Sequence, residues 1–241
     1  MAKKGQYTYE YPHPAVTADC VVFGYDGKEL KVLLIKRGKE KEASTTAYVG
    51  EWALPGGFLD VEKDRNIAHT ASRELREETG LKVSVKDFKE VGTFSDINRD
   101  PRERVITIAH YALVKLSQVQ ADTDAEKADW FPLDEIPALA FDHDKILRHA
   151  FSRIKQDIHF EPVGFELLPE VFTLPQLQNL YESILEVKFD RRNFANKMKH
   201  YEILTEVEDQ APRNGTRTPV KYRFDKENYD RLKNSGFQLE F

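Results

Sequence analysis

The stretch that decides the fold runs from Trp52 to Leu81 and reads WALPGGFLDVEKDRNIAHTASRELREETGL. Its second half predicts the end of a helix, because Gly80 stands where a glycine commonly ends one. Glu74, Glu77 and Glu78 are spaced i, i+3 and i+4, so their carboxylates share one helix face. Such a face is most often plain solvated surface. Three carboxylates after a Pro-Gly-Gly turn nevertheless favour a site for Mg²⁺ or Mn²⁺, because hard cations prefer oxygen ligands and can bridge phosphates.

This segment resembles the Nudix box, in which a glycine and a glutamate precede the pattern Arg-Glu-aliphatic-x-Glu-Glu-x-Gly-aliphatic. The second part is intact from Arg73 to Leu81, and Gly57 takes the place of the opening glycine. The loop between them is longer than the family spacing. The position of the loop glutamate holds Lys63 when it is counted from Gly57, and Arg65 when it is counted back from Arg73. We therefore expect the metal site to survive only in part, and we expect a domain without hydrolytic activity.

Composition sets broad limits. The chain of 241 residues is 40% hydrophobic and 32% charged, which is ordinary for a globular protein with one large or two small domains. Its net charge of −5 gives no overall basic character that would indicate nucleic-acid binding. The single cysteine, Cys20, lies in an apolar run and is expected to be a buried hydrophobe. No run is long enough to cross a membrane and no signal peptide is visible, so we expect a cytoplasmic protein with no membrane partner.

The segments around the box predict a layered α+β fold. Ala15 to Tyr25 and Leu30 to Ile35 are expected strands joined by the turn Asp26-Gly27. A further strand is expected from Val105 to Val114, and an amphipathic helix from Asp142 to Ile158. Mixed strands with helices on both sides fit an α/β/α sandwich with a mixed sheet, which is also the fold that the Nudix resemblance implies.

The same resemblance implies a pocket for a nucleoside diphosphate linked to another group. Two adjacent glycines let the backbone come close to a ligand, and their N–H groups can face phosphates. A lone arginine is as often a surface residue, and a tryptophan as often a core residue. With those alternatives open, the candidate ligand-binding residues are Arg37, Trp52, Pro55, Gly56, Gly57, Phe94, Arg102 and Arg104.

The second half of the chain changes character after Phe160. Thr173 is an expected helix N-cap, and an apolar stripe follows it at helical spacing as far as Leu185. A second helix is expected from Asp190 to His200, with Phe194 and Met198 facing inward. A hairpin follows, with its strands at 201–207 and 220–224. Helix, turn, basic helix and hairpin is the order of a winged helix, in which the second helix enters the major groove.

Basic residues are concentrated on the second helix and the hairpin. Residues 188–200 carry five cations and one acid, although the segment from 161 to 241 is not basic overall. Each part alone would be an ordinary solvated surface, but their order favours DNA binding. The candidates for groove or phosphate contact are Arg191, Arg192, Asn193 and Lys197, and those for backbone contact are Thr173, Gln176, Lys188, Arg217, Thr218 and Lys221.

Nearly the whole chain resembles the Nudix-related transcriptional regulators of bacterial NAD metabolism, the NrtR family. The resemblance rests on Asp96 to Arg104, Trp130 to His143 and Glu161 to Gln178. It implies a Nudix domain, here residues 1–160, followed by a winged-helix domain, here residues 161–241. It also implies a homodimeric repressor of NAD biosynthesis or salvage genes that binds palindromic DNA and responds to ADP-ribose, or to a sugar in some relatives.

Two other functions stay open at this stage. A Mg²⁺-dependent ADP-ribose pyrophosphatase with an accessory second domain would use Glu74, Glu77 and Glu78 as metal ligands. An enzyme acting on RNA ends would also use the basic helix, and a preference for single strands would distinguish it. The sequence does not give the operator, the regulated genes or the direction of regulation.

Overall fold

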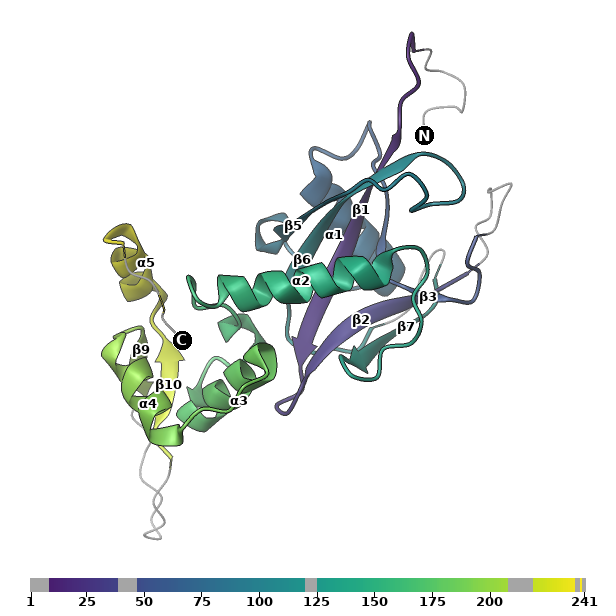
Figure 1. The fold of residues 1–241 in the computed structure, drawn as a ribbon. Helices are drawn as coiled ribbons and strands as arrows, with labels where there is room; N and C mark the ends of the chain where they lie inside the picture. Colours follow the sequence, from purple (N-terminus) through teal and green to yellow (C-terminus); the bar gives the residue numbers. More distant parts are fainter. Residues whose placement is uncertain (1–8, 39–46, 120–124, 208–218, 237–238, 240–241) are drawn as a thin grey trace. The chain divides into compact units, whose positions relative to one another are not determined.

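The computed structural model describes residues 9–38, 47–119, 125–207, 219–236 and 239 (Figure 1). The chain divides into two compact units. The first consists of residues 1–23 and 31–151, and the second of residues 24–30 and 152–241.

The first unit is built on a seven-stranded mixed sheet with the order β3-β2-β1-β6-β5, in which β4 pairs with β1 and β7 pairs with β2. The central strands β1 and β6 run parallel, whereas β4, β5 and β7 pair antiparallel with their neighbours. The strands are β1 (Ala15–Tyr25), β2 (Leu30–Arg37), β3 (Trp52–Ala53), β4 (Gly56–Phe58), β5 (Lys89–Phe94), β6 (Val105–Leu113) and β7 (Ala125–Pro132).

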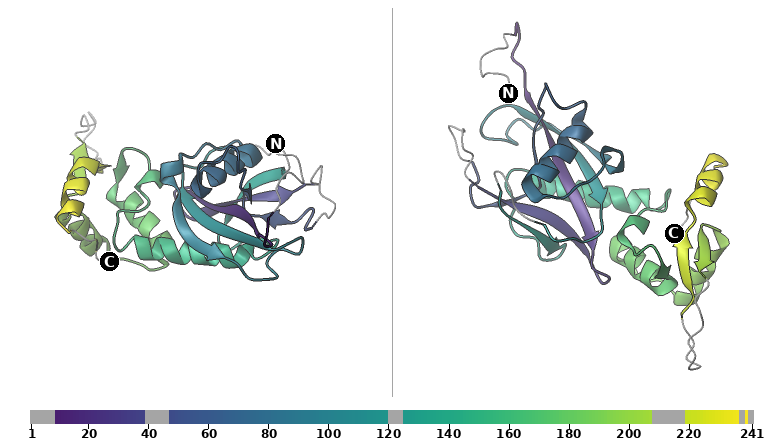
Figure 2. Two further views of the ribbon diagram at one scale, coloured as in Figure 1. Left: turned by 90° about the horizontal axis from the view of Figure 1, so that it is seen from above. Right: turned by 180° about the vertical axis from the view of Figure 1, so that it is seen from behind.

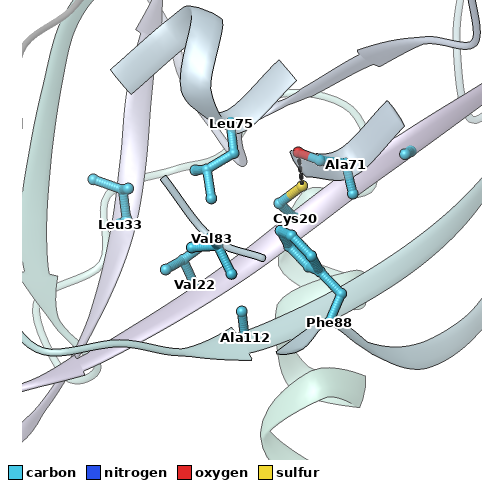
Figure 3. Close-up of a cluster of buried hydrophobic side chains, with 9 residues drawn as sticks. Cys20, Val22, Leu33, Ala71, Leu75, Val83, Phe88 and Ala112 are labelled. Carbon is cyan, nitrogen blue, oxygen red and sulfur yellow. Dashed lines mark hydrogen bonds between the residues drawn. The ribbon is translucent and has the colours of Figure 1, made fainter. Parts of the chain in front are cut away.

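Helices cover both faces of this sheet (Figures 1 and 2). Side chains alternate along β1, so Cys20 and Val22 pack with Leu75 and other residues under α1 (Ile67–Thr79), as Figure 3 shows. Phe23 points to the opposite face, where its ring centroid lies 6.3 Å from that of Phe151 in α2 (His143–Asp157). The expected α/β/α sandwich with a mixed sheet is confirmed, and so is the burial of Cys20.

The box helix ends as its sequence predicts. Gly80 caps α1 in the left-handed conformation with a φ of 71°, and its N–H donates to the carbonyl of Arg76. Asn66 caps the other end, where its side chain accepts from the N–H of His69. The 3₁₀ helix η1 (Val85–Asp87) follows α1.

The second unit contains a winged helix. The 3₁₀ helix η2 (Phe165–Leu167) is followed by β8 (Phe172–Thr173), α3 (Leu174–Leu185), α4 (Arg191–His200), β9 (Leu204–Val207), β10 (Lys221–Phe224) and α5 (Lys226–Asn234). The expected hairpin is confirmed, because β9 and β10 pair antiparallel, and β8 joins them on the other side of β10. The sequence pattern does not predict β8 or α5.

Apolar side chains of α3 and α4 form the core of this unit. Leu177, Leu180 and Tyr181 are fully buried on α3. Phe194 is 3% exposed and Met198 is fully buried on α4, so their expected inward orientation is confirmed. Within the described residues, no helix is both long and apolar enough to span a bilayer.

Candidate ligand site and nucleic-acid interface

The glycine turn, residues 54–57, lies between β1 and α1 and runs into β4. Its two glycines are the first residues of β4, where Gly56 pairs with Asp19 and Gly57 with Ala18. A Cβ on Gly56 would overlap the carbonyl oxygen of Ala18, and one on Gly57 would lie 2.5 Å from the carboxyl carbon of Glu74. Glycine is therefore required at position 56, where a side chain would displace the β1 backbone, whereas a Cβ at position 57 would displace only the Glu74 carboxylate.

Two of the three box glutamates lie beside this turn. Glu78 is buried, and its Oε2 accepts a 2.8 Å hydrogen bond from the Gly56 N–H. Burial raises the pKa of Glu78 well above its usual value, and the charge of Glu74 adds to the effect. Burial likewise raises the pKa of Glu74. Two buried carboxylates that lie close together are both negatively charged only at a cost in free energy. A bound cation would remove that cost, and the carboxylate oxygens could serve as its ligands.

The third glutamate, Glu77, has a side chain that is 40% exposed and accepts a 3.1 Å hydrogen bond from Arg73. The same guanidinium nitrogen donates to Glu74 at 2.7 Å. In the part of the chain that the structure describes, no group of three or more His, Cys, Asp or Glu residues is arranged to hold a metal ion. An ion between Glu74 and Glu78 would therefore need oxygen atoms of a bound phosphate or water to complete its coordination.

The box loop keeps a carboxylate that residue counting missed. Asp64 has a fully buried side chain and binds the Arg73 guanidinium through two hydrogen bonds of 2.7 and 3.0 Å. These hydrogen bonds lower the pKa of Asp64. Lys63 instead extends to Asp60 and is 60% exposed. The family spacing places the loop glutamate at position 63 or 65, whereas the acid that reaches the box helix is at position 64. The loop has not simply exchanged an acid for a cation.

Two of the predicted arginines flank one aromatic ring. The Arg37 guanidinium lies 4.9 Å from the ring centroid of Phe141, and the Arg102 guanidinium lies 5.5 Å from the same ring. Arg102 also lies 5.4 Å from the Phe58 ring, next to the glycine turn, and binds Asp100 at 2.9 Å. The positive charge of Arg37 lowers the pKa of Glu78 and so offsets part of the effect of burial. Cations, aromatic rings and paired carboxylates thus meet at one place, which suits a phosphorylated nucleoside.

Phe141 was not a sequence candidate. Its backbone has a φ of 54°, in the region that a bulky residue rarely adopts, and such strain concentrates at functional sites. Its ring also lies 4.6 Å from the ring of Tyr48. The nearest sequence signal was the segment from Trp130 to His143, which contains Phe141 but does not single it out.

The other four predicted ligand residues make further contacts within the domain. Trp52 packs edge-on against Phe131, with ring centroids 4.6 Å apart. Phe94 is 8% exposed and packs against the ring of His149. Pro55 is buried, and its carbonyl accepts a hydrogen bond from the Cys20 N–H. Arg104 is exposed. The rings that the guanidinium groups of Arg37 and Arg102 approach include Phe58 and Phe141, which the sequence did not single out.

A buried polar network fixes the loop that carries Arg102. Arg99 donates to Asp142 at 2.9 Å and 3.2 Å and to Asp19 at 3.1 Å. Next to Asp142, the Nδ1 of His143 accepts a 2.9 Å hydrogen bond from the Leu54 N–H. Burial lowers the pKa of His143, which suits a neutral ring that accepts this bond. β1, the glycine turn and the start of α2 are thereby joined around the site.

Replacing Glu78 by glutamine is expected to stabilise the protein at pH 8 in the presence of a chelator. The raised pKa of Glu78 means that stability falls as the pH rises from about 4.5 towards its folded-state pKa. Glutamine keeps an acceptor for the Gly56 N–H but carries no charge. We expect Tm to rise by about 2–4 °C at pH 8, or ~1 kcal/mol, and to match the wild type at pH 4.5. A lower Tm at pH 8 would show that the fold stabilises the ionised carboxylate.

The first turn of α4 presents polar side chains to solvent. Arg191, Arg192 and Asn193 are exposed, while Lys197 is half-buried. The Asp190 side chain caps the helix by accepting a 2.8 Å hydrogen bond from the Asn193 N–H. With its apolar side buried, α4 turns its basic side outward, as a helix entering a groove would require.

Three of the six residues that were predicted to contact the DNA backbone bind partners within the protein. Thr173 and Gln176 form a reciprocal capping box at the start of α3. Lys188 binds the carboxylate of Glu182 at 2.7 Å while 89% of its side chain stays exposed. Lys221 lies in β10 and is half-buried. Arg217 and Thr218 lie outside the described residues.

Comparison with known proteins identifies both domains. Residues 13–150 match the NUDIX domain, and residues 164–224 match the NrtR DNA-binding winged helix domain. The chain is 34% identical to the ADPR responsive transcriptional repressor NtrR of Acinetobacter baylyi over 92% of this chain and 86% of that protein. It is 40% identical to the ADP-ribose pyrophosphatase of Methanocaldococcus jannaschii over 57% of this chain and 73% of that enzyme.

The solved structures of Shewanella oneidensis NrtR are also similar. Its complex with a 27mer DNA matches with a TM-score of 0.71 and 27% identity, over 93% of this chain and 97% of that one. Its NUDIX domain with ADP ribose matches with a TM-score of 0.53 and 29% identity, over 61% of this chain and 94% of that one. On this evidence the chain belongs to the NrtR family of regulators, in which a Nudix domain is followed by a DNA-binding winged helix.

Proposed function

We propose that the chain is an ADP-ribose-responsive transcriptional repressor of NAD biosynthesis or salvage genes. The observation that carries this function is the similarity to the Acinetobacter repressor, which extends over both domains and 92% of the chain. The M. jannaschii pyrophosphatase, by contrast, matches 57% of the chain. Because the similarity to the repressor includes the winged helix, it favours a function in which the winged helix takes part. We assign residues 1–160 to sensing and residues 161–241 to DNA binding.

For DNA binding, α4 is the proposed recognition helix. It presents Arg191, Arg192 and Asn193 on its exposed first turn, which is the part of such a helix that contacts base edges. The Shewanella relative with the same winged helix was solved with a 27mer DNA. In a homodimer, two α4 helices would meet two half-sites of a palindrome one helical turn or a multiple apart. Thr173, Gln176, Lys188, Lys197, Arg217, Thr218 and Lys221 remain proposed contacts to the DNA.

For sensing, the proposed pocket lies where Arg37, Arg102 and Phe141 approach the glycine turn. The guanidinium groups would bind the diphosphate, and the aromatic ring would pack against the base or a ribose. The Nudix domain of the Shewanella relative was solved with ADP ribose, which carries all of these groups. Binding of the nucleotide would favour a dimer geometry in which the two α4 helices no longer match the half-sites.

A Mg²⁺-dependent ADP-ribose pyrophosphatase is the second candidate. Glu74 and Glu78 are paired beside the glycine turn, and the loop carboxylate Asp64 is present. A divalent ion there would supply charge neutralisation at the diphosphate. Glu74 and Glu77 both bind Arg73, however, and the described residues provide no cluster of three metal ligands. We therefore propose that the pocket binds ADP-ribose without cleaving it.

The test begins with selection of duplexes from a random pool by the full chain. We expect enrichment of a palindromic sequence. The protein is incubated separately with ADP-ribose and Mg²⁺, and the nucleotide is then separated by chromatography. Recovery of intact ADP-ribose supports a sensor. AMP in catalytic amounts would establish the pyrophosphatase, and failure to enrich any duplex would remove the repressor.

A further inference from the structure

The turn between α3 and α4 is held by a buried carboxylate on α3. Glu182 is 9% exposed and accepts three hydrogen bonds: from the Phe189 N–H at 3.0 Å, from Gln178 Nε2 at 2.8 Å and from Lys188 Nζ at 2.7 Å. Burying a carboxylate is unfavourable unless hydrogen bonds replace its water. Here the turn supplies two of the three donors and α3 the third, and the pKa of Glu182 falls to about 2, chiefly through Lys188.

Gln178, which lies one helical turn before Glu182 on α3, also binds the turn between α3 and α4. Its Nε2 donates both to Glu182 and to the backbone carbonyl of Phe189, the latter at 2.9 Å. Residues four apart share a helix face, so both side chains reach the same side of α3. The N–H and the C=O of one turn residue, Phe189, are thus each bound by a side chain of α3.

Phe189 has a defined position relative to α4. It directly precedes the N-cap residue Asp190, and its ring lies 5.4 Å from that of Phe194. A hydrophobic residue before the N-cap that packs on the fourth helical residue sets the angle at which the chain enters a helix. The turn also contains Glu186 in the left-handed conformation, with a φ of 56°, which surrounding contacts must hold in place. Backbone hydrogen bonds, ring packing and the helix cap therefore fix the first turn of α4 on α3.

We propose that Glu182 and Gln178 are positioning residues that hold the Phe189 backbone, and with it the first turn of α4, in the orientation needed for duplex DNA. This inference rests on the proposed DNA-binding function. Arg191, Arg192 and Asn193 follow Phe189 within four residues, so a shift of Phe189 would displace all three from the bases they meet. Neither Glu182 nor Gln178 needs to touch DNA.

The test compares three single variants of the full chain with the wild type on the selected duplex. Glu182→Ala removes every acceptor for the turn, and we expect it to weaken binding about tenfold, comparable to the loss of one base contact. Glu182→Gln keeps an acceptor for the Phe189 N–H, and we expect affinity within about threefold of the wild type. Glu227→Ala, on the exposed side of α5, removes the same charge away from the turn and serves as the matched control.

A further measurement separates positioning from general electrostatics. Hydrogen exchange at the Phe189 amide, measured without DNA, should accelerate in Glu182→Ala and stay slow in Glu182→Gln. Faster exchange together with weaker binding supports the proposal.

Several results would overturn it. Wild-type affinity in Glu182→Ala, an equal loss in Glu227→Ala, or unchanged exchange at Phe189 would each remove the positioning role while leaving DNA binding in place. A wild-type chain that binds no duplex would instead overturn the proposed function, and the positioning role would fall with it.

Discussion

The double variant Arg191→Ala, Arg192→Ala is expected to bind the selected duplex on the order of 100-fold more weakly than the wild type at physiological salt. Both side chains are exposed on the first turn of α4, so they are free to meet DNA while the helix core of Phe194 and Met198 stays intact. If both contact phosphates, the slope of log affinity against log salt should fall by about 1.8, or by about 0.9 for Arg192→Ala alone. Fluorescence anisotropy of a labelled duplex over a range of salt concentrations measures both quantities.

The matched control is Arg148→Ala. Arg148 is an exposed arginine of α2 that pairs with Asp144, so its removal changes the net charge by the same amount as each α4 substitution. We expect wild-type slope and an affinity within about twofold, because distant surface charges are screened at this salt concentration. An unchanged slope in the double variant would take α4 out of the DNA interface.

Replacing Arg102 by alanine is expected to weaken ADP-ribose binding by at least about tenfold while the affinity for DNA without nucleotide stays at the wild-type level. The guanidinium lies over the rings of Phe58 and Phe141, where a diphosphate would meet it. By thermodynamic linkage, the ADP-ribose concentration that releases DNA should rise by the same factor as the dissociation constant of the nucleotide. Calorimetry gives the nucleotide affinity, and anisotropy gives the release curve.

Two further variants test whether the loss of affinity is specific to the Arg102 guanidinium. Arg102→Lys keeps the charge but loses the two-pronged geometry, so an intermediate affinity is expected. Arg104→Ala changes an exposed arginine two residues away and should have less effect. Because Arg102 also binds the buried Asp100, Tm is measured for each variant. An ADP-ribose affinity equal to that of the wild type in a folded Arg102→Ala protein would place the diphosphate elsewhere.

Features set by short-range geometry could be predicted from sequence. The end of α1 follows from the left-handed conformation of Gly80, and the start of α3 from the capping residues Thr173 and Gln176. β7 was missed because its sequence, AEKADWFP, lacks a regular apolar alternation and its position depends on pairing with β2. The two-residue strand β8 likewise exists through its pairing with β10.

The candidate site shows where residue counting fails. The spacing of the box placed the loop carboxylate at position 63 or 65, but a longer loop can bring any nearby residue to Arg73. Asp64 is chosen by the geometry of two hydrogen bonds, which no count contains. Phe141 meets Arg37 and Arg102 through long-range folding, and its unusual backbone conformation is not encoded by a recognisable turn motif. Arg37 and Arg102 were predictable as cations, but their common ring was not.

The most direct test of a nucleotide-responsive repressor follows the selected duplex while ADP-ribose is added. The labelled duplex is saturated with the full chain in Mg²⁺, and anisotropy is recorded as the nucleotide concentration rises. The nucleotide is then recovered and separated by chromatography. We predict a fall in anisotropy to the value of free DNA, with ADP-ribose recovered intact. A duplex that stays bound at saturating ADP-ribose, or release that requires conversion of the nucleotide to AMP, would contradict a sensor that acts by binding alone.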